Sequence, residues 1–226
     1  MALNRRMGPE TAATRSALMD ATEAVMRDEG YAAVSSRRVA ERAGVNQQTV
    51  YYYFQTMDDL LLAAFRRRTL SLLKQLERTM AAERPLHAYW RTLGDPHEAA
   101  LTVEYLALAN HNERIRRETL EFGERLRRLQ VEQLAERIKL SVRGKEQVAP
   151  IAVIMAVTYV GHLLGFEATL GIRGGHREVR ALMEWCLRQL EPIGGGREGA
   201  RASGRSARVS RSRPGNSDSS QRRTSS

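Results

Sequence analysis

The segment "SSRRVAERAGVNQQTVYYYF", residues 35–54, contains two short helical patterns separated by a glycine. Ser35 suits the N-cap of the first helix and Gly44 its C-terminal end, because serine accepts a backbone N–H and glycine adopts the left-handed conformation found there. The second pattern, "NQQTVYYYF", starts at about Asn46, only two residues later. Two short helices joined by a glycine turn, behind a longer helix, predict a helix-turn-helix unit.

The second pattern ends with three consecutive tyrosines, Tyr51, Tyr52 and Tyr53. Successive residues of an α-helix turn by about 100°, so these side chains cannot share one apolar face. Val50 and Phe54 lie four residues apart and are predicted to hold the helix to its domain. The tyrosines are then left to face another partner, although packing of one or two of them against neighbouring helices is the alternative.

The composition indicates an anionic partner. The chain has 226 residues and a formal net charge of +10. From Pro192 onward it contains eight arginines and two acidic residues, so +6 of this charge lies in the last part of the chain. Nucleic acid is the first expected partner and an acidic membrane surface the second. Rich in Gly, Ser and Arg, this last part is predicted to be disordered.

Helical periodicity dominates the remaining sequence, and no convincing strand pattern appears. An all-α fold is therefore expected. Helices are predicted over residues 10–28, from a Thr56 cap to about Met80, and over about 86–93, 97–110, 115–140, 151–171 and 177–192, with a loop over residues 141–150.

Three observations concern the compartment. Cys186 is the single cysteine, which excludes an internal disulfide and a multi-cysteine metal cluster and fits a reducing environment. The first fifteen residues lack the apolar core of a signal peptide. The apolar stretch 151–171 approaches the length of a membrane span but carries His162 and Glu167, which favours a buried helix. A cytoplasmic protein with no membrane partner is expected.

The segment "AVSSRRVAERAGVNQQTVYYYFQTMDDLLLAAF", residues 33–65, resembles the DNA-binding end of the TetR family of bacterial transcriptional repressors. The resemblance rests on the N-cap serine, "VA", "AGV", "TVYYYF" and the acidic start of the next helix. It is strong over about residues 18–65 and only architectural beyond. It implies a DNA-binding domain over residues 1–56 and an effector-binding and dimerisation domain over 57–192. The disordered basic tail predicted from composition follows over 193–226. Met57 occupies a position where the family often has a phosphate-binding lysine.

The chemistry of this segment favours DNA. Gln47 and Gln48 lie in the first turn of the second helix, the end that approaches base edges in the major groove, and a glutamine amide can donate and accept together, as adenine requires. Hydroxyl groups and Arg37 can reach phosphates, and Arg37 can also reach a guanine edge. The resemblance implies base reading by Arg37, Gln47, Gln48 and Tyr51, and backbone anchoring or groove lining by Ser35, Thr49, Tyr52 and Tyr53.

The resemblance also implies a small-molecule effector that binds between helices of the C-terminal domain and lowers DNA affinity, and a homodimer. Effector-lining residues are predicted where aromatic or polar groups interrupt apolar helices: Trp90, Tyr105, Asn110, His111, Tyr159, His162 and Phe166. Ordinary core packing is the alternative for each. Gly161 and Gly165, with Leu182 and Trp185, are predicted at the dimer interface, and close packing within one subunit is the alternative for the glycines.

Two function classes compete with a homodimeric, ligand-responsive repressor of a palindromic operator. One is a protein that coats nucleic acid nonspecifically through its basic tail. The other is an enzyme, which the sequence disfavours: His87, His97 and His111 lack the close spacing of a metal site, and no Gly-rich phosphate loop is present. We therefore expect no catalytic residue, no metal and no cofactor. The operator, the effector and the choice between repression and activation stay open.

Overall fold

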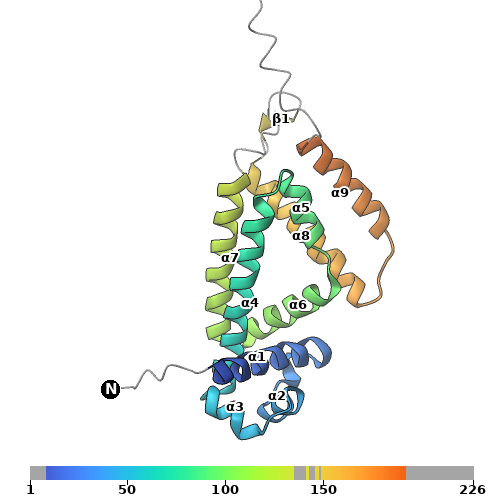
Figure 1. Cartoon of the computed structure of the whole chain (residues 1–226). Helices are drawn as coiled ribbons and strands as arrows, with labels where there is room; N and C mark the ends of the chain where they lie inside the picture. The colour runs from blue at the N-terminus through green and yellow to red at the C-terminus, as the bar shows by residue number, and fades with distance from the viewer. Residues whose placement is uncertain (1–8, 135–140, 143–145, 148, 192–226) are drawn as a thin grey trace, which may run out of the picture. The chain divides into compact units, whose positions relative to one another are not determined.

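The computed structural model describes residues 9–134, 141–142, 146–147 and 149–191. In these residues the chain is almost entirely α-helical (Figure 1), which confirms the predicted all-α fold. The elements are α1 (Pro9–Glu29), a short 3₁₀ helix η1 (Tyr31–Ala33), α2 (Ser36–Ala43), α3 (Gln47–Tyr53), α4 (Met57–Met80), α5 (Pro85–Thr92), α6 (Pro96–His111), α7 (Glu113–Leu134), β1 (Ser141–Val142), β2 (Glu146–Gln147), α8 (Pro150–Thr169) and α9 (His176–Leu190). The predicted tail and the last residues of the helix predicted over 115–140 lie outside the described residues.

Helices α2 and α3 form the expected helix-turn-helix. The Ser35 hydroxyl accepts the backbone N–H of Arg38 at 3.3 Å, and Gly44 ends α2 with a φ of 67°. The Asn46 side chain caps α3 by accepting the backbone N–H of Gln48 at 2.8 Å. Buried Val39 and Val50 pack with Leu18 and Met19 of α1 into one apolar cluster. Local capping and one small core therefore fix the two helices.

Helix α4 belongs to three apolar clusters. Its Leu60 and Ala64 complete the core of α1–α3, whereas Leu61 and Phe65 pack with α6 in a second cluster. Leu76, near its C-terminal end, packs with α5, α8 and α9 in a third. Figure 1 shows α1–α3 at one end of α4 and α7 running beside it. Packing is thus continuous across residue 56, where the sequence places a domain boundary.

The small residues of α8 pack inside the subunit. A Cβ on Gly161 would lie 2.5 Å from the Leu93 Cβ, and one on Gly165 would lie 2.9 Å from the Ala99 Cβ. Both glycines therefore let α8 approach the segment that joins α5 to α6. We correct their assignment accordingly: the close approach is to their own chain rather than to a second subunit.

The segment predicted as a loop over residues 141–150 contains a small deviation from the all-helical pattern. Strands β1 and β2 pair antiparallel, with Ser141 opposite Gln147 and Val142 opposite Glu146. Two residues per strand are too few to show an alternating pattern in the sequence, so the prediction missed this ribbon.

We predict that Gly161→Ala lowers the free energy of unfolding by about 1–3 kcal/mol, because the added methyl group meets the Leu93 Cβ, which cannot move without its backbone. Chemical denaturation followed by circular dichroism measures this change. Gly123→Ala in α7 is the matched control, since no atom lies within 4 Å of the added Cβ. This control should be neutral or gain up to about 1 kcal/mol from helix propensity. Equal stability of the two variants would contradict the packing assignment.

Candidate nucleic-acid interface and ligand cavity

The outer surface of α3 presents polar and aromatic side chains to solvent. Val50 and Phe54 are buried, so the opposite side of the helix faces outward. Gln47 and Gln48 are exposed in its first turn. Tyr51 and Tyr52 follow, with 50% and 73% of their surface exposed. The structure thus brings four of the predicted DNA-binding residues together on one accessible surface.

Two adjacent arginines in α2 differ in whether they bind acidic side chains of the protein. Arg38 donates to both carboxylate oxygens of Glu29, at 2.8–3.0 Å, and to Glu41 at 2.9 Å. These hydrogen bonds raise the pKa of Arg38 and lower that of Glu29. Arg37 is exposed, and within the described part of the chain its guanidinium has no acidic partner. Arg37 is therefore the arginine of this pair that is available to a phosphate or a guanine edge.

A buried serine connects α2 to two of the predicted base-reading residues. The Gln47 amide donates from Nε2 to the Ser36 Oγ at 2.7 Å, and the Tyr51 hydroxyl donates to the same oxygen at 3.0 Å. Ser36 is the first residue of α2 and has only 6% of its surface exposed. Ser36 is not among the residues predicted from the sequence, because nothing in the "SS" pair distinguishes it from its neighbour Ser35.

The remaining predicted DNA-binding residues are less exposed or already engaged. Tyr53 is half-buried against the core of α1–α3, and its ring meets Tyr52 edge-to-face at a centroid distance of 5.1 Å. It thus follows in part the packing alternative. Thr49 is half-buried. The Ser35 hydroxyl is exposed while it caps α2. Met57 packs against the same core, so it supplies apolar contact where a lysine would supply charge.

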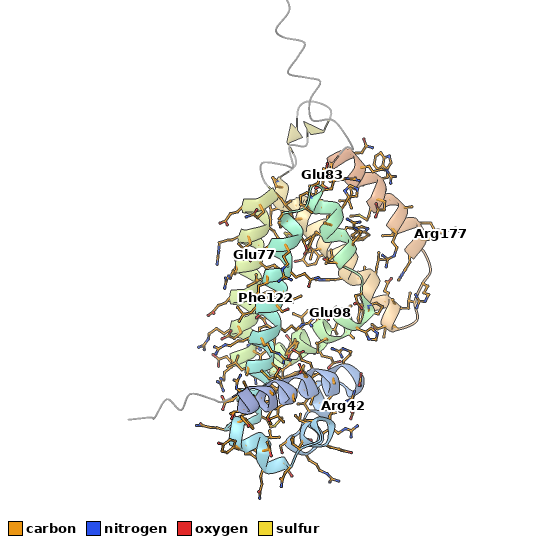
Figure 2. All side chains as sticks on the ribbon, in the orientation of Figure 1. Arg42, Glu77, Glu83, Glu98, Phe122 and Arg177 are labelled. Atoms are coloured by element: carbon orange, nitrogen blue, oxygen red, sulfur yellow. The ribbon has the colours of Figure 1, made fainter. Side chains whose placement is uncertain are left out.

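A cavity of about 170 Å³ lies among α4, α5, α6, α7 and α8. Its wall is mainly apolar, and Figure 2 labels Glu98 of α6 and Phe122 of α7, which both border it. The lining residues are Arg68, Leu72, Gln75, Leu76, Thr79, Tyr89, Thr92, Leu93, Gly94, Asp95, Glu98, Ala99, Thr102, Phe122, Leu126 and His162. An apolar wall with a few polar groups is the usual character of a small-molecule site.

The polar groups of the cavity centre on Arg68. Its Nη2 lies 2.8 Å from a carboxylate oxygen of Glu98 and 3.3 Å from the Thr102 hydroxyl. His162 of α8 borders the cavity and is exposed. Burial by the surrounding protein, followed by repulsion from Arg68, lowers the pKa of its imidazole. The neutral form of His162 is favoured, so the ring can both donate and accept a hydrogen bond.

Among the seven predicted effector residues, His162 alone appears in this cavity wall. Trp90 and Tyr105 are buried in apolar clusters. Tyr159 is exposed and accepts from Arg127 at 2.6 Å, and Phe166 is half-buried. Asn110 and His111 are exposed at the end of α6, where the His111 ring stacks on Tyr31. These six residues lie outside this cavity wall, and their assignment to an effector site stays a prediction. The missed lining residues lie on apolar helix faces, which in sequence are indistinguishable from core.

The outer faces of α8 and α9 carry exposed apolar side chains. Leu182 and Trp185 of α9 have 57% and 54% of their surface exposed, and Tyr159 and Leu163 of α8 are similarly exposed. Helix α8 is also long and apolar enough to meet the length and composition criteria for a membrane span. An 18-residue stretch of it has a mean hydropathy of 1.7, and 33% of that stretch is buried. Core helices of soluble proteins meet the same criteria, so this is weak evidence for a membrane location.

Among the described residues, no group of three His, Cys, Asp or Glu side chains is placed to hold a metal ion. Glu167 and His176 do approach each other, with a carboxylate oxygen 2.8 Å from the His176 Nε2. This pair joins the end of α8 to the start of α9 and provides two ligands at most.

Comparison with known proteins identifies the N-terminal part. Residues 18–64, which span most of α1 to the start of α4, match the sequence model of the family described as bacterial regulatory proteins, tetR family. The chain carries a TetR-family DNA-binding domain. The helix-turn-helix described above is the part of this domain that ends in the exposed surface of α3.

Solved structures share the TetR-like all-α fold over most of the chain. A TetR transcription regulator from Haloarcula marismortui is 17% identical, with a TM-score of 0.59 over 79% of this chain and 97% of its own. A transcriptional regulator from a Rhodococcus species is 20% identical, with a TM-score of 0.58, and the match covers 78% of this chain and 91% of that protein. A protein from Saccharomonospora viridis, solved in complex with choline, is 17% identical, with a TM-score of 0.62. This match covers 76% of this chain and 96% of that protein. No curated protein matches the chain in sequence. The family match supports DNA-binding regulation, and these matches support the fold.

Proposed function

We propose that this TetR-family protein is a homodimeric transcriptional repressor that binds a palindromic operator and leaves it when a small molecule occupies the cavity. The exposed surface of α3 on a TetR-family domain carries this proposal. Gln47, Gln48 and Tyr51 present hydrogen-bonding groups there, and Arg37 on the preceding helix has no acidic partner among the described residues. A recognition helix of this kind reads base edges in the major groove while neighbouring hydroxyls contact phosphates.

The exposed apolar faces of α8 and α9 are the proposed dimer interface. Large side chains such as Leu182 and Trp185 are left in solvent by a single chain, and burying them against a second copy would recover apolar stabilisation. A twofold axis at this surface would give two copies of α3, which suits half-sites about 34 Å apart on one face of the duplex. Leu182 and Trp185 therefore remain in the proposed interface, whereas Gly161 and Gly165 do not.

The cavity is the proposed effector site. Its lining includes Arg68 and Leu72 of α4, and the first turns of the same helix belong to the DNA-binding core. A molecule that fits better when α4 is displaced shifts the population of the two arrangements and so lowers DNA affinity. The largely apolar wall favours a small, mainly apolar effector with a polar group near Arg68 and His162. The choline bound to the Saccharomonospora viridis protein supports a small molecule as the kind of ligand to test.

We predict that Gln47→Ala weakens binding to the preferred duplex by about 1–3 kcal/mol and changes the base preference, because it removes the amide that faces a base edge. Selection of bound duplexes from a random library, followed by titration of the recovered sequence, measures both effects. Gln133→Ala, an exposed glutamine in the last turn of α7, is the control and should change neither.

The selection also tests the competing function. Enrichment of one inverted repeat, by the full chain and by a chain that ends at residue 192, is expected. If no motif is enriched and retention disappears with salt or with the tail, the protein coats nucleic acid nonspecifically and the repressor proposal fails.

We predict that Leu182→Glu combined with Trp185→Glu converts the dimer to a monomer and weakens binding to the inverted repeat, because charges replace exposed apolar side chains at the proposed interface. Analytical ultracentrifugation measures the mass, and circular dichroism checks the fold. Leu106→Glu with Leu120→Glu, two equally exposed leucines on α6 and α7, is the matched control and should remain dimeric. A wild-type protein that sediments as a monomer at micromolar concentration would exclude this interface.

We predict that Thr92→Trp blocks effector binding, since the exposed Thr92 borders the cavity and an indole there occupies its volume. Small molecules that raise the Tm of the wild-type protein in a thermal-shift screen should no longer raise that of the variant. Thr169→Trp is the control, because Thr169 is also exposed, makes the same type of hydrogen bond to a carbonyl three residues earlier, and lies outside the cavity wall. Unchanged Tm shifts in Thr92→Trp would place the effector elsewhere.

A further inference from the structure

The Ser36 hydroxyl is a shared acceptor for two side chains of the α3 surface. The Gln47 Nε2 lies 2.7 Å from the Ser36 Oγ, and the Tyr51 hydroxyl lies 3.0 Å from it. Gln47 and Tyr51 are one turn apart on α3, so a single buried oxygen holds two side chains of the same side of the helix. Both donors are themselves solvent-exposed, and water could satisfy them equally well.

We propose that Ser36 is a positioning residue for sequence readout: it orients the Gln47 amide and the Tyr51 hydroxyl so that the surface selects adenine over guanine opposite Gln47. This inference rests on the proposed sequence-specific DNA binding. Ser36 acts from behind the two side chains, and it touches no base itself.

The Gln47 amide explains the choice of base. An amide nitrogen carries two N–H groups, and the bond to Ser36 engages one of them. The carbonyl oxygen and the second N–H remain for DNA, which matches the N6 donor and N7 acceptor of adenine in the major groove. An amide free to rotate can instead turn both N–H groups toward O6 and N7 of guanine, which are both acceptors. Anchoring by Ser36 therefore disfavours guanine.

The Tyr51 hydroxyl is constrained in the same way. Its proton is donated to Ser36, so its oxygen faces outward as an acceptor only. An acceptor suits the amino group of adenine or cytosine at a base edge, whereas a phosphate oxygen requires a donor. The geometry thus assigns Tyr51 to a base edge rather than to the phosphate backbone.

A purely structural role for Ser36 is poorly supported by its contacts. The N-cap of α2 is Ser35, and the packing of α2 on α1 and α3 is made by Val39 and Ala40. Because Gln47 and Tyr51 are exposed, loss of their bonds to Ser36 leaves both groups solvated rather than buried without a partner. The benefit of the bonds is that two flexible side chains are ordered before DNA arrives.

The test compares full-length wild type, Ser36→Ala and Ser36→Thr on the duplex recovered from the wild-type selection and on its adenine-to-guanine variants. Ser36→Ala should bind the preferred duplex about 2- to 10-fold more weakly, the value of a hydrogen bond, and discriminate less between adenine and guanine at one position. Ser36→Thr keeps the hydroxyl and should retain the discrimination. Ser71→Ala, an exposed serine of α4, controls for loss of a hydroxyl. The Tm of every variant should stay near that of the wild type.

A double-mutant cycle separates positioning from direct contact and does not depend on whether Ser36→Thr folds well. In a Gln47→Ala background, Ser36→Ala should no longer change the ratio of adenine to guanine affinity at the position that Gln47 reads, because the amide through which it acts there is absent. An equal loss of affinity on all duplexes in both backgrounds would mean that Ser36 binds phosphate directly, and would overturn the inference. If the wild-type protein enriches no motif at all, the proposed function fails first and this inference fails with it.

Discussion

Helix α4 is the constraint on which the rest of the structure depends. Its 24 residues extend about 36 Å, and successive turns belong to different cores. Leu60 faces α1–α3, and Leu61, the next residue, faces α6. Arg68 and Leu72, about two and three turns further, border the cavity. Because close-packed cores do not deform continuously, a displacement of α4 at the cavity must be accommodated in the DNA-binding domain as well. Under the proposed function, a ligand there would need no contact with DNA to change the affinity for it.

The junction between α1, α4 and α6 combines specific bonds with unsatisfied groups. The backbone N–H of Tyr31 donates to Glu104 at 2.7 Å, and Arg67 lies 2.7 Å from Asp20. In contrast, the Tyr105 hydroxyl and one oxygen of Glu23 are buried without a hydrogen-bond partner among the described residues. Burial raises the pKa of both side chains. Unpaired buried polar atoms cost free energy, so a shift of α1 against α6 that paired them would recover part of that cost. The position of α1 against α6 is thus less strongly fixed at this junction than the packing in the apolar cores on either side.

The parts of this fold that the sequence predicts are those determined by neighbouring residues. Ser35, Gly44 and Thr56 mark helix ends through bonds within a few residues, and Val50 and Phe54 are buried at the expected spacing. The cavity was not predictable in this way, because Leu72 and Phe122 have the same apolar pattern whether they line a void or fill a core. The partners of Gly161 and Ser36 lie on other helices. Only the tertiary arrangement shows that the glycine packs against its own chain and that the serine accepts hydrogen bonds from Gln47 and Tyr51.

Charge and base recognition are separate contributions in this chain. The segment after residue 191 carries +6 of the net +10, which leaves +4 for residues 1–191. Many arginines in the described region are also engaged by carboxylates, as Arg38 is by Glu29 and Arg114 by Asp59. Surface pairs of this kind add little stability, but they withhold cations from phosphates. Counterion release should therefore depend mainly on the basic segment, whereas under the proposed function base preference should depend on a few uncharged groups, among them the two that donate to Ser36. Salt dependence and sequence preference can then change independently, since they arise from different parts of the chain.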